Sequence, residues 1–325
     1  MKIVITDHRF PDVAQERRAV ESAGGSLVDA QTTDEQELCK VCHDADAILT
    51  ARAPITRRVI ESMQRCRVIV RYGIGVDTVD IAAATKHGVM VANVPDYCVD
   101  EVSDHALTLL LMLSRQMVSA ISLGRQDRWG MSKVPALHRL RGQICGLVGC
   151  GKIGSLLAFK VKSLGMRVIV YDPYMTEIRC KEIGAEGASF DALLAQSDFI
   201  SLHAPLNRET QYLFGEAAFA KMKPTAFLLN TSRGGLIDEA ALLAALDSGK
   251  ISGAGLDVLE SETAMTPVRS ALVDHPKIIV TAHTAWLSIE ARTELQAKAI
   301  EQALAAIRGE IPYGLINREV VNASC

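Results

Sequence analysis

Short apolar runs alternate with polar-faced helical segments along the first hundred residues of the chain. Such alternation of strand and helix is typical of a parallel β-sheet covered by helices. The predicted strands are Ile3–Thr6, Ser26–Val28, Ala47–Thr50, Val68–Arg71 and Val89–Ala92. The predicted helices are Ala14–Ala23, Asp34–Cys42, Thr56–Met63 and Ile81–His87.

The same alternation returns in the second half of the chain. The strands predicted there are Ile144–Val148, Arg167–Tyr171, Phe199–Leu202, Ala226–Leu229, Gly253–Val258 and Lys277–Thr281. The pattern therefore predicts an α/β protein with two doubly wound parallel-sheet domains, of the Rossmann or flavodoxin-like kind.

Two longer helices are predicted outside these repeats. The segment Asp100–Gln116 is apolar on nearly every side, so it must be buried on several sides, and we expect that burial between the domains or against a second subunit. A last helix, Leu287–Ile307, is expected to return and pack on the first domain.

The strand that begins near Cys145 leads into a glycine-rich turn, Gly149-Cys150-Gly151-Lys152-Ile153-Gly154. A helical segment and a second strand follow, and that strand ends at Asp172, 18 residues after Gly154. Glycines at these positions permit a tight turn, the approach of a pyrophosphate to the backbone, and close packing of helix on strand. Asp172 lies where a carboxylate would accept hydrogen bonds from the adenosine ribose. The arrangement predicts a dinucleotide site.

A competing motif overlaps this turn. Residues 146–152 match the start of a P-loop, but that motif next requires Ser or Thr to hold magnesium, and Ile153 stands there. A carboxylate at Asp172 would also repel a 2′-phosphate. We therefore expect NAD(H) as the cofactor, and no metal.

Composition narrows the remaining classes. The 325 residues are 49% hydrophobic and 22% charged, with a net charge of -3, which gives no electrostatic reason to bind nucleic acid or an anionic membrane. The densest apolar run, residues 106–113, is too short to span a bilayer. Without a signal-peptide pattern, the expected location is cytoplasmic and the eight cysteines are expected to be reduced. The haem-attachment pattern Cys39-x-x-Cys42-His43 is interpreted as coincidence, because that chemistry takes place after export.

Three further segments follow predicted strands and carry side chains suited to carbonyl reduction. Arg233, beside two glycines, offers a two-pronged donor to a carboxylate. His283 is suited to proton transfer near neutral pH, and Glu262 would hold its ring. Each residue taken alone is more often ordinary packing or solvated surface. Their order after a dinucleotide motif favours an enzyme.

With these residues in view, the chain resembles the D-isomer-specific 2-hydroxyacid dehydrogenase family over nearly its whole length. The resemblance is strongest to the branch with phosphoglycerate dehydrogenases and C-terminal-binding proteins. Besides the glycine turn with Tyr171-Asp172-Pro173-Tyr174, the matching segments are residues 71–77 (RYGIGVD), 93–97 (NVPDY), 230–235 (NTSRGG), 256–258 (LDV) and 283–286 (HTAW).

The resemblance implies an NAD-dependent D-2-hydroxyacid dehydrogenase, or 2-keto acid reductase. Arg233 would bind the substrate carboxylate, His283 would be the acid/base, and Glu262 would be its partner. The backbone of Ile74 and Gly75 would cradle the carboxylate. The cofactor would be held by Gly149, Gly151, Lys152, Ile153, Gly154, Asp172, His203, Ala204, Pro205, Thr231, Ser232, Asp257 and His283.

The family's fold also implies the domain limits. Residues 1–98 with 289–325 would form the substrate-binding domain, and 99–288 the NAD-binding domain, with a cleft between them. A homodimer would form through the NAD-binding domain. Two positions depart from the family pattern: Ala282 and Thr263 stand where the family has proline. Both changes would loosen loops without removing a reacting group.

The sequence leaves the substrate open between the glyoxylate or hydroxypyruvate class and phosphohydroxypyruvate. Arg52 would suit a second anionic group, or it is a surface residue; Trp286 would pack a substrate side chain, or it is interface core. The alternative function is an NAD(H)-sensing corepressor like the C-terminal-binding proteins. The enzyme is favoured because Arg233, Glu262 and His283 are all present and because the chain shows no added interaction segments.

Overall fold

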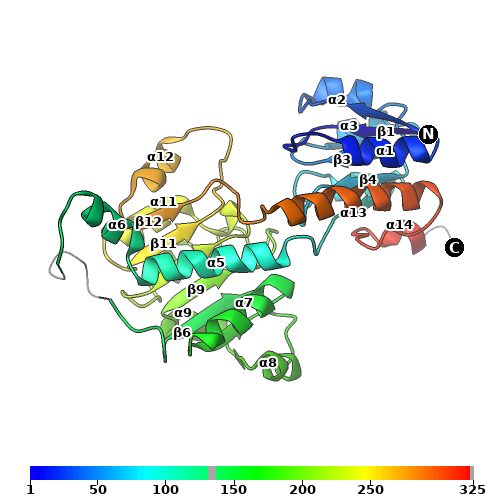
Figure 1. Ribbon diagram of the computed structural model, residues 1–325. Helices are drawn as coiled ribbons and strands as arrows, with labels where there is room; N and C mark the ends of the chain where they lie inside the picture. The colour runs from blue at the N-terminus through cyan, green and yellow to red at the C-terminus, as the bar shows by residue number, and fades with distance from the viewer. Residues whose placement is uncertain (131–136, 323–325) are drawn as a thin grey trace. The chain divides into compact units, whose positions relative to one another are not determined.

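The computed structural model describes residues 1–130 and 137–322. The chain divides into two compact units, Met1–Tyr97 with Ser288–Cys325, and Cys98–Leu287. Each unit contains one parallel sheet covered by helices (Figure 1). The prediction of an α/β fold with two parallel sheets is confirmed.

The first unit is built on a five-stranded parallel sheet with the order β2-β1-β3-β4-β5. All five strands lie within one residue of the predicted limits. The strands are β1 (Lys2–Ile5), β2 (Ser26–Asp29), β3 (Ala47–Thr50), β4 (Val68–Arg71) and β5 (Met90–Ala92). The helices between them are α1 (Ala14–Ser22), α2 (Glu35–Val41), α3 (Arg57–Ser62) and α4 (Ile81–Lys86).

Side-chain caps fix where three of these helices begin. The side chain of Asp34 accepts hydrogen bonds from the backbone of the first turn of α2, and Thr56 and Asp80 do the same for α3 and α4. Such caps satisfy backbone donors that a helix leaves unpaired at its start. They set the length of each strand-to-helix loop.

The C-terminal segment completes the first unit. The long helix α13 (Ile289–Ile307) contacts α1, β3 and β4, as expected from the sequence (Figure 1). Beyond it, Asn317 is buried and accepts a hydrogen bond from the backbone N–H of Val91 (2.7 Å). Its amide nitrogen donates to the carbonyl of Val89 (2.9 Å). These bonds join the end of the chain, with α14 (Glu319–Asn322), to edge strand β5.

The second unit is built on a seven-stranded parallel sheet with the order β12-β11-β10-β9-β6-β7-β8. The order reverses between β6 and β9, and ligands of such sheets bind outside the strand ends at that point. The strands are β6 (Ile144–Val148), β7 (Arg167–Tyr171), β8 (Glu186–Gly187), β9 (Phe199–Leu202), β10 (Phe227–Asn230), β11 (Gly253–Leu256) and β12 (Ile278–Val280). The helices are α7 (Lys152–Ser163), α8 (Glu177–Ile183), α9 (Phe190–Gln196), α10 (Glu216–Phe219), α11 (Glu239–Asp247) and α12 (Pro267–Asp274), with a 3₁₀ turn at Gly234–Leu236.

Much of the apolar surface of helix α5 (Val99–Ser114) is buried by contacts within the second unit. It contacts α7, β10 and β11, and seven of its residues are buried. A Cβ added to Gly255 of β11 would lie 3.1 Å from the Cβ of Leu109, so glycine lets the helix lie close to the sheet. Much of its apolar face is therefore buried within the second unit itself, while Leu107, Leu111 and Met112 are only half-buried. Burial of these residues between the domains or against a second subunit stays a prediction.

Helix α6 and strand β8 are among the elements that the sequence did not predict. Helix α5 ends at Ser114, two residues before the predicted end, because Gln116 has a left-handed backbone (φ 49°) and the chain bends by 60° into α6 (Met117–Arg125). Helix α6 buries none of its residues, and its apolar side chains Met117, Val118 and Ile121 are exposed. Strand β8 has two exposed residues and no apolar run to reveal it.

Within residues 1–130 and 137–322, no single helix has both the length and the apolar composition needed to cross a bilayer. Only the bent pair of α5 and α6 meets those criteria when the two are counted together.

Replacing Asn317 with Ala should destabilise the first unit. The change leaves the N–H of Val91 and the carbonyl of Val89 buried without their partner, at a cost of about 1–3 kcal/mol. Urea unfolding followed by circular dichroism should show an earlier transition than in the unmodified chain. Asn322→Ala, at an exposed position, is the control and should leave the transition in place. Equal midpoints for both variants would contradict the role given to Asn317.

Candidate active site

The residues predicted for the second unit lie where its parallel strands end. Since the carboxyl ends of parallel strands meet at one edge of a sheet, residues far apart in sequence come to the same edge. These residues are Gly149 after β6, Asp172 after β7, His203 after β9, Thr231 and Arg233 after β10, Asp257 after β11 and His283 after β12.

The glycine turn is shaped by close contact between two backbones. Gly149 has φ +84°, and a Cβ there would lie 2.8 Å from the backbone nitrogen of Ala204. A Cβ on Gly154 would lie 2.8 Å from the carbonyl oxygen of Gly149. By contrast, a Cβ on Gly151 would meet nothing within 4 Å. The turn is therefore closely packed at Gly149 and Gly154, and it is open at Gly151.

Helix α7 begins at this open side. Its N-cap residue, Gly151, has no side chain to bond the first backbone N–H groups, which start at Lys152 and Ile153. Unpaired N–H groups at a helix start bind phosphate oxygens. The turn and the helix together fit the pyrophosphate of a dinucleotide.

Asp172 holds the turn in place from the end of β7. Its carboxylate accepts hydrogen bonds from the backbone N–H of Cys150 (2.8 Å) and of Tyr174 (2.9 Å). A carboxylate has about four acceptor sites, so capacity remains for ribose hydroxyls. The residue is half-buried beside the glycine turn, as a ribose ligand requires.

The loop after β9 lies against the glycine turn at the point between β6 and β9 where the strand order reverses. His203 pairs its Nε2 with the hydroxyl of Ser201 (2.9 Å). Burial lowers the pKa of His203 to about 4, because a charged ring would lose its hydration there. The ring is therefore neutral at physiological pH. Ala204 and Pro205 continue this loop.

After β10, a hydroxyl without a protein partner lies beside a well-bonded turn. Thr231 Oγ1 is buried and has no hydrogen-bond partner among the atoms that the structure describes. Its neighbour Ser232 donates to the carbonyl of Leu202 (2.7 Å). Buried polar groups are nearly always paired. The orphaned hydroxyl of Thr231 fits a site that a ligand completes.

Arg233 projects from the same turn. The side-chain amide of Asn230 donates to the carbonyl of Arg233 (2.8 Å), and Arg233 Nη1 donates to the carbonyl of Ser232 (2.7 Å). A Cβ on Gly234 would lie 2.0 Å from the carbonyl carbon of Leu259, so only glycine brings this turn against the segment after β11. The guanidinium is thereby fixed at the strand edge.

His283 and Glu262 form the predicted pair. His283 Nδ1 lies 2.8 and 2.9 Å from the two carboxylate oxygens of Glu262, and the side chains are 27% and 25% exposed. An ionised carboxylate only accepts, so Nδ1 carries the hydrogen of this bond. Nε2 is then the ring atom that can accept or release a proton.

Asp257 supports the segment that carries His283. Its side chain is 1% exposed, and it accepts hydrogen bonds from the hydroxyl of Thr281 (2.5 Å) and the backbone N–H groups of Thr284 and Ala285 (both 2.9 Å). The resemblance implied that Asp257 helps to hold the cofactor. It gave no sign of this supporting role. Trp286, the residue after Ala285, is half-buried.

In the first unit, Arg52 also lies at the carboxyl edge of its sheet. The carboxylate of Asp7 accepts hydrogen bonds from the backbone N–H groups of Ala51 (3.0 Å), Arg52 (2.8 Å) and Ala53 (3.1 Å). These bonds hold the loop after β3. Asp7 was not singled out from the sequence, since nothing in a lone strand-end Asp distinguishes it.

The segment with Ile74 and Gly75 follows β4 in the same unit. The side-chain amide of Asn93 donates to the carbonyl of Ile74 (2.6 Å), and Val94 donates to the carbonyl of Gly73 (3.0 Å). The backbone predicted to cradle a carboxylate is therefore held from β5.

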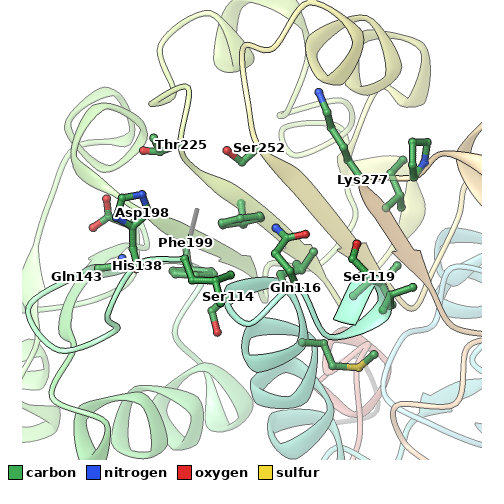
Figure 2. Close-up of a pocket in the computed structure, with 18 residues that line it drawn as sticks. Ser114, Gln116, Ser119, His138, Gln143, Asp198, Phe199, Thr225, Ser252 and Lys277 are labelled. Atoms are coloured by element: carbon green, nitrogen blue, oxygen red, sulfur yellow. The ribbon is translucent and has the colours of Figure 1, made fainter. Parts of the chain in front are cut away.

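A cavity of about 610 Å³ lies elsewhere in the second unit, at the amino ends of β9 to β12 (Figure 2). Phe199, Asp198, Ser252 and Lys277 are among its lining residues. It contains none of the residues predicted for the reaction, which follow the opposite ends of these strands. Among residues 1–130 and 137–322, no cluster of three or more His, Cys, Asp or Glu side chains is placed to hold a metal ion.

Comparison with known proteins agrees with this geometry. Residues 107–285 match the NAD binding domain of the D-isomer specific 2-hydroxyacid dehydrogenases. A glyoxylate reductase of Korarchaeum cryptofilum is 38% identical over 86% of this chain and 84% of its own length. A D-3-phosphoglycerate dehydrogenase of Bacillus subtilis is 36% identical over 97% of this chain and 59% of its own length. The structure of the Aquifex aeolicus D-lactate dehydrogenase with NAD and lactic acid has a TM-score of 0.88, with 26% identity over 98% of this chain and 99% of that one.

The matched region contains the glycine turn, Asp172, Arg233, Glu262 and His283. The chain therefore belongs to the D-isomer specific 2-hydroxyacid dehydrogenase family and is an NAD-dependent oxidoreductase acting on 2-hydroxy acids.

Proposed function

We propose that this enzyme reduces a small 2-keto acid with His283 as the acid/base and Arg233 as the carboxylate-binding residue. The observation that supports this most is the bond between His283 and Glu262, at the sheet edge that also carries Arg233 and the glycine turn. A protein that only sensed NAD(H) would have no need of this pair. We therefore do not favour the corepressor function.

Arg233 binds and polarises the substrate in this proposal. A guanidinium offers two parallel donors to a carboxylate, which fixes the orientation of the keto acid as well as its position. The turn of Arg233 is held by Asn230 on one side and by the close approach of Gly234 on the other. Ile74 and Gly75 are proposed to add backbone N–H groups for the same carboxylate.

His283 supplies the proton for the new hydroxyl. NADH, when bound, provides the hydride that adds to the carbonyl carbon. As negative charge develops on the carbonyl oxygen, protonated His283 donates from Nε2 to that oxygen. Glu262 fixes the ring through Nδ1 and stabilises the imidazolium before transfer. In the oxidation direction, neutral His283 accepts the hydroxyl proton at the same atom.

For the substrate, we propose the glyoxylate and hydroxypyruvate class or phosphohydroxypyruvate. Relatives named as glyoxylate reductase and as phosphoglycerate dehydrogenase support these two groups. Arg52, whose loop is held by Asp7, is proposed to bind a second anionic group, and Trp286 to pack against the substrate. NADH oxidation with glyoxylate, hydroxypyruvate and phosphohydroxypyruvate tests the choice. If Arg52→Ala reduces phosphohydroxypyruvate as fast as the unmodified enzyme does, Arg52 does not bind the second anionic group.

Replacing His283 with Ala should lower kcat by about 10²–10⁴-fold, the usual contribution of general acid catalysis. NADH binding, measured by fluorescence titration, should be largely kept. His275→Ala is the control, since His275 pairs with Asp247 at the end of α12 and takes no part in the reaction. A fall in kcat of less than tenfold for His283→Ala would remove this residue as the acid.

Replacing Asp172 with Ala should weaken NAD binding and narrow the preference for NAD over NADP. The change removes the proposed ribose acceptor and the charge that repels a 2′-phosphate. The ratio of kcat/KM for the two cofactors measures the effect. Asp191→Ala, on α9 and paired with Lys221, is a control outside the dinucleotide turn. An unchanged ratio in Asp172→Ala would mean that the ribose is recognised elsewhere.

We propose that the enzyme is a homodimer formed through the second unit. Helix α6 supports this, because Met117, Val118 and Ile121 are 39%, 54% and 45% exposed and none of its residues is buried. Light scattering should give twice the chain mass of 35.1 kDa. Ile121→Asp should shift the protein to the monomer, whereas Ile178→Asp, at an exposed position on α8, should not. A monomeric unmodified protein would contradict the proposal.

A further inference from the structure

The segment that carries His283 lies over a buried carboxylate with few charged neighbours. Asp257 is 1% exposed, and among the described residues the one basic side chain within ion-pair distance is His105, with its Nε2 3.6 Å from Asp257 Oδ1. His105 belongs to α5, far from His283 in the sequence. Its ring is not part of the His283–Glu262 pair.

A directed chain of hydrogen bonds joins His105 to this carboxylate. His105 Nε2 lies 2.9 Å from Thr281 Oγ1, and the Thr281 hydroxyl donates to Asp257 Oδ1 at 2.5 Å. The carboxylate can only accept, so the single hydroxyl hydrogen of Thr281 is used towards Asp257. The oxygen of Thr281 must then accept from His105, which fixes the ring with a hydrogen on Nε2.

Asp257, the last member of this hydrogen-bond chain, holds the backbone around His283. Asp257 accepts from the N–H groups of Thr284 and Ala285, and its own carbonyl accepts from the N–H of His283 (2.9 Å). His283 has φ +55°, a left-handed conformation that is uncommon and strained for a non-glycine residue. Such a conformation persists only where the surroundings impose it. Here the surroundings are the backbone and carboxylate of Asp257.

We propose that His105 is a positioning residue for His283, acting through Thr281 and Asp257. Its donation orients the Thr281 hydroxyl, the hydroxyl fixes one carboxylate oxygen of Asp257, and the carboxylate fixes the backbone on the C-terminal side of His283. The inference rests on the proposed function of His283. It is also consistent with Ala282, because a segment pinned in this way does not need a proline before the histidine.

The test compares variants that break the chain at different points. His105→Leu removes the donor, Thr281→Val removes the hydroxyl with little change of shape, and His105→Gln keeps an N–H donor. Thr108→Val is the matched control, since the hydroxyl of Thr108 bonds only the backbone of its own helix, at Asp104 (2.8 Å). Misplacement of a catalytic group by about 1 Å lowers rates on the order of 10²-fold.

We expect His105→Leu and Thr281→Val each to lower kcat by about 10- to 100-fold, with KM for the keto acid nearly unchanged. The double variant should be no slower than the slower single variant, because both act on one chain. His105→Gln should recover most of the loss, and Thr108→Val should match the unmodified enzyme. Additive losses, or no recovery with Gln, would overturn the proposal in favour of simple packing.

A second measurement follows the segment itself without substrate or cofactor. The chain has two tryptophans, so Trp129→Phe leaves Trp286, three residues after His283, as the sole reporter. In that background, acrylamide quenching of Trp286 fluorescence should increase with His105→Leu and Thr281→Val but not with Thr108→Val. Unchanged quenching in the first two variants would also overturn the proposal.

The outcomes separate this inference from the proposed function. If His283→Ala remains fully active, His283 is not the acid and the proposed function fails, whatever the quenching shows. If His283→Ala is inactive while His105→Leu has normal kcat and normal quenching, the proposed function stands and the role of His105 is excluded.

Discussion

The carboxylate of Asp257 is buried at the end of β11, in the seven-stranded sheet, and it holds the segment that carries the proposed acid/base. Three donors reach it from residues 281–285. A buried carboxylate is tolerated only when such bonds replace its lost hydration. The bonds that stabilise the buried charge of Asp257 therefore also hold the backbone of His283 in one conformation, with its ring next to Glu262.

Close backbone contacts position the segments after β6 and β10 at the same edge of the sheet. Gly149 allows the turn after β6 to lie against the loop of His203, Gly154 allows the start of α7 to lie against the carbonyl of Gly149, and Gly234 allows the turn of Arg233 to lie against Leu259. A Cβ at any of these positions would overlap backbone atoms. Hydrogen bonds and missing side chains together place the cofactor turn, the carboxylate-binding residue and the acid/base at one edge of the sheet.

Much of this arrangement could be predicted from the sequence, because short apolar strands and the glycine turn are local signals. The sequence also identified Arg233, Glu262 and His283 as candidates, since each follows a predicted strand. It did not reveal α6, an exposed helix of nine residues that follows the bend at Gln116, or β8, which has only two residues, both exposed. Nor did it reveal the bonds from His105 and Thr281 to Asp257, because no local pattern records which distant side chains will meet.

Everything above depends on the transfer of a hydride from NADH to the carbonyl carbon of a 2-keto acid. The most direct measurement uses NADH deuterated at C4 on the transferred face, with hydroxypyruvate as substrate, and locates the deuterium in the product by mass spectrometry. We expect deuterium on C2 of D-glycerate, and loss of this product with His283→Ala. Product without deuterium at C2, or NADH binding with no reduction of any 2-keto acid tried, would contradict it.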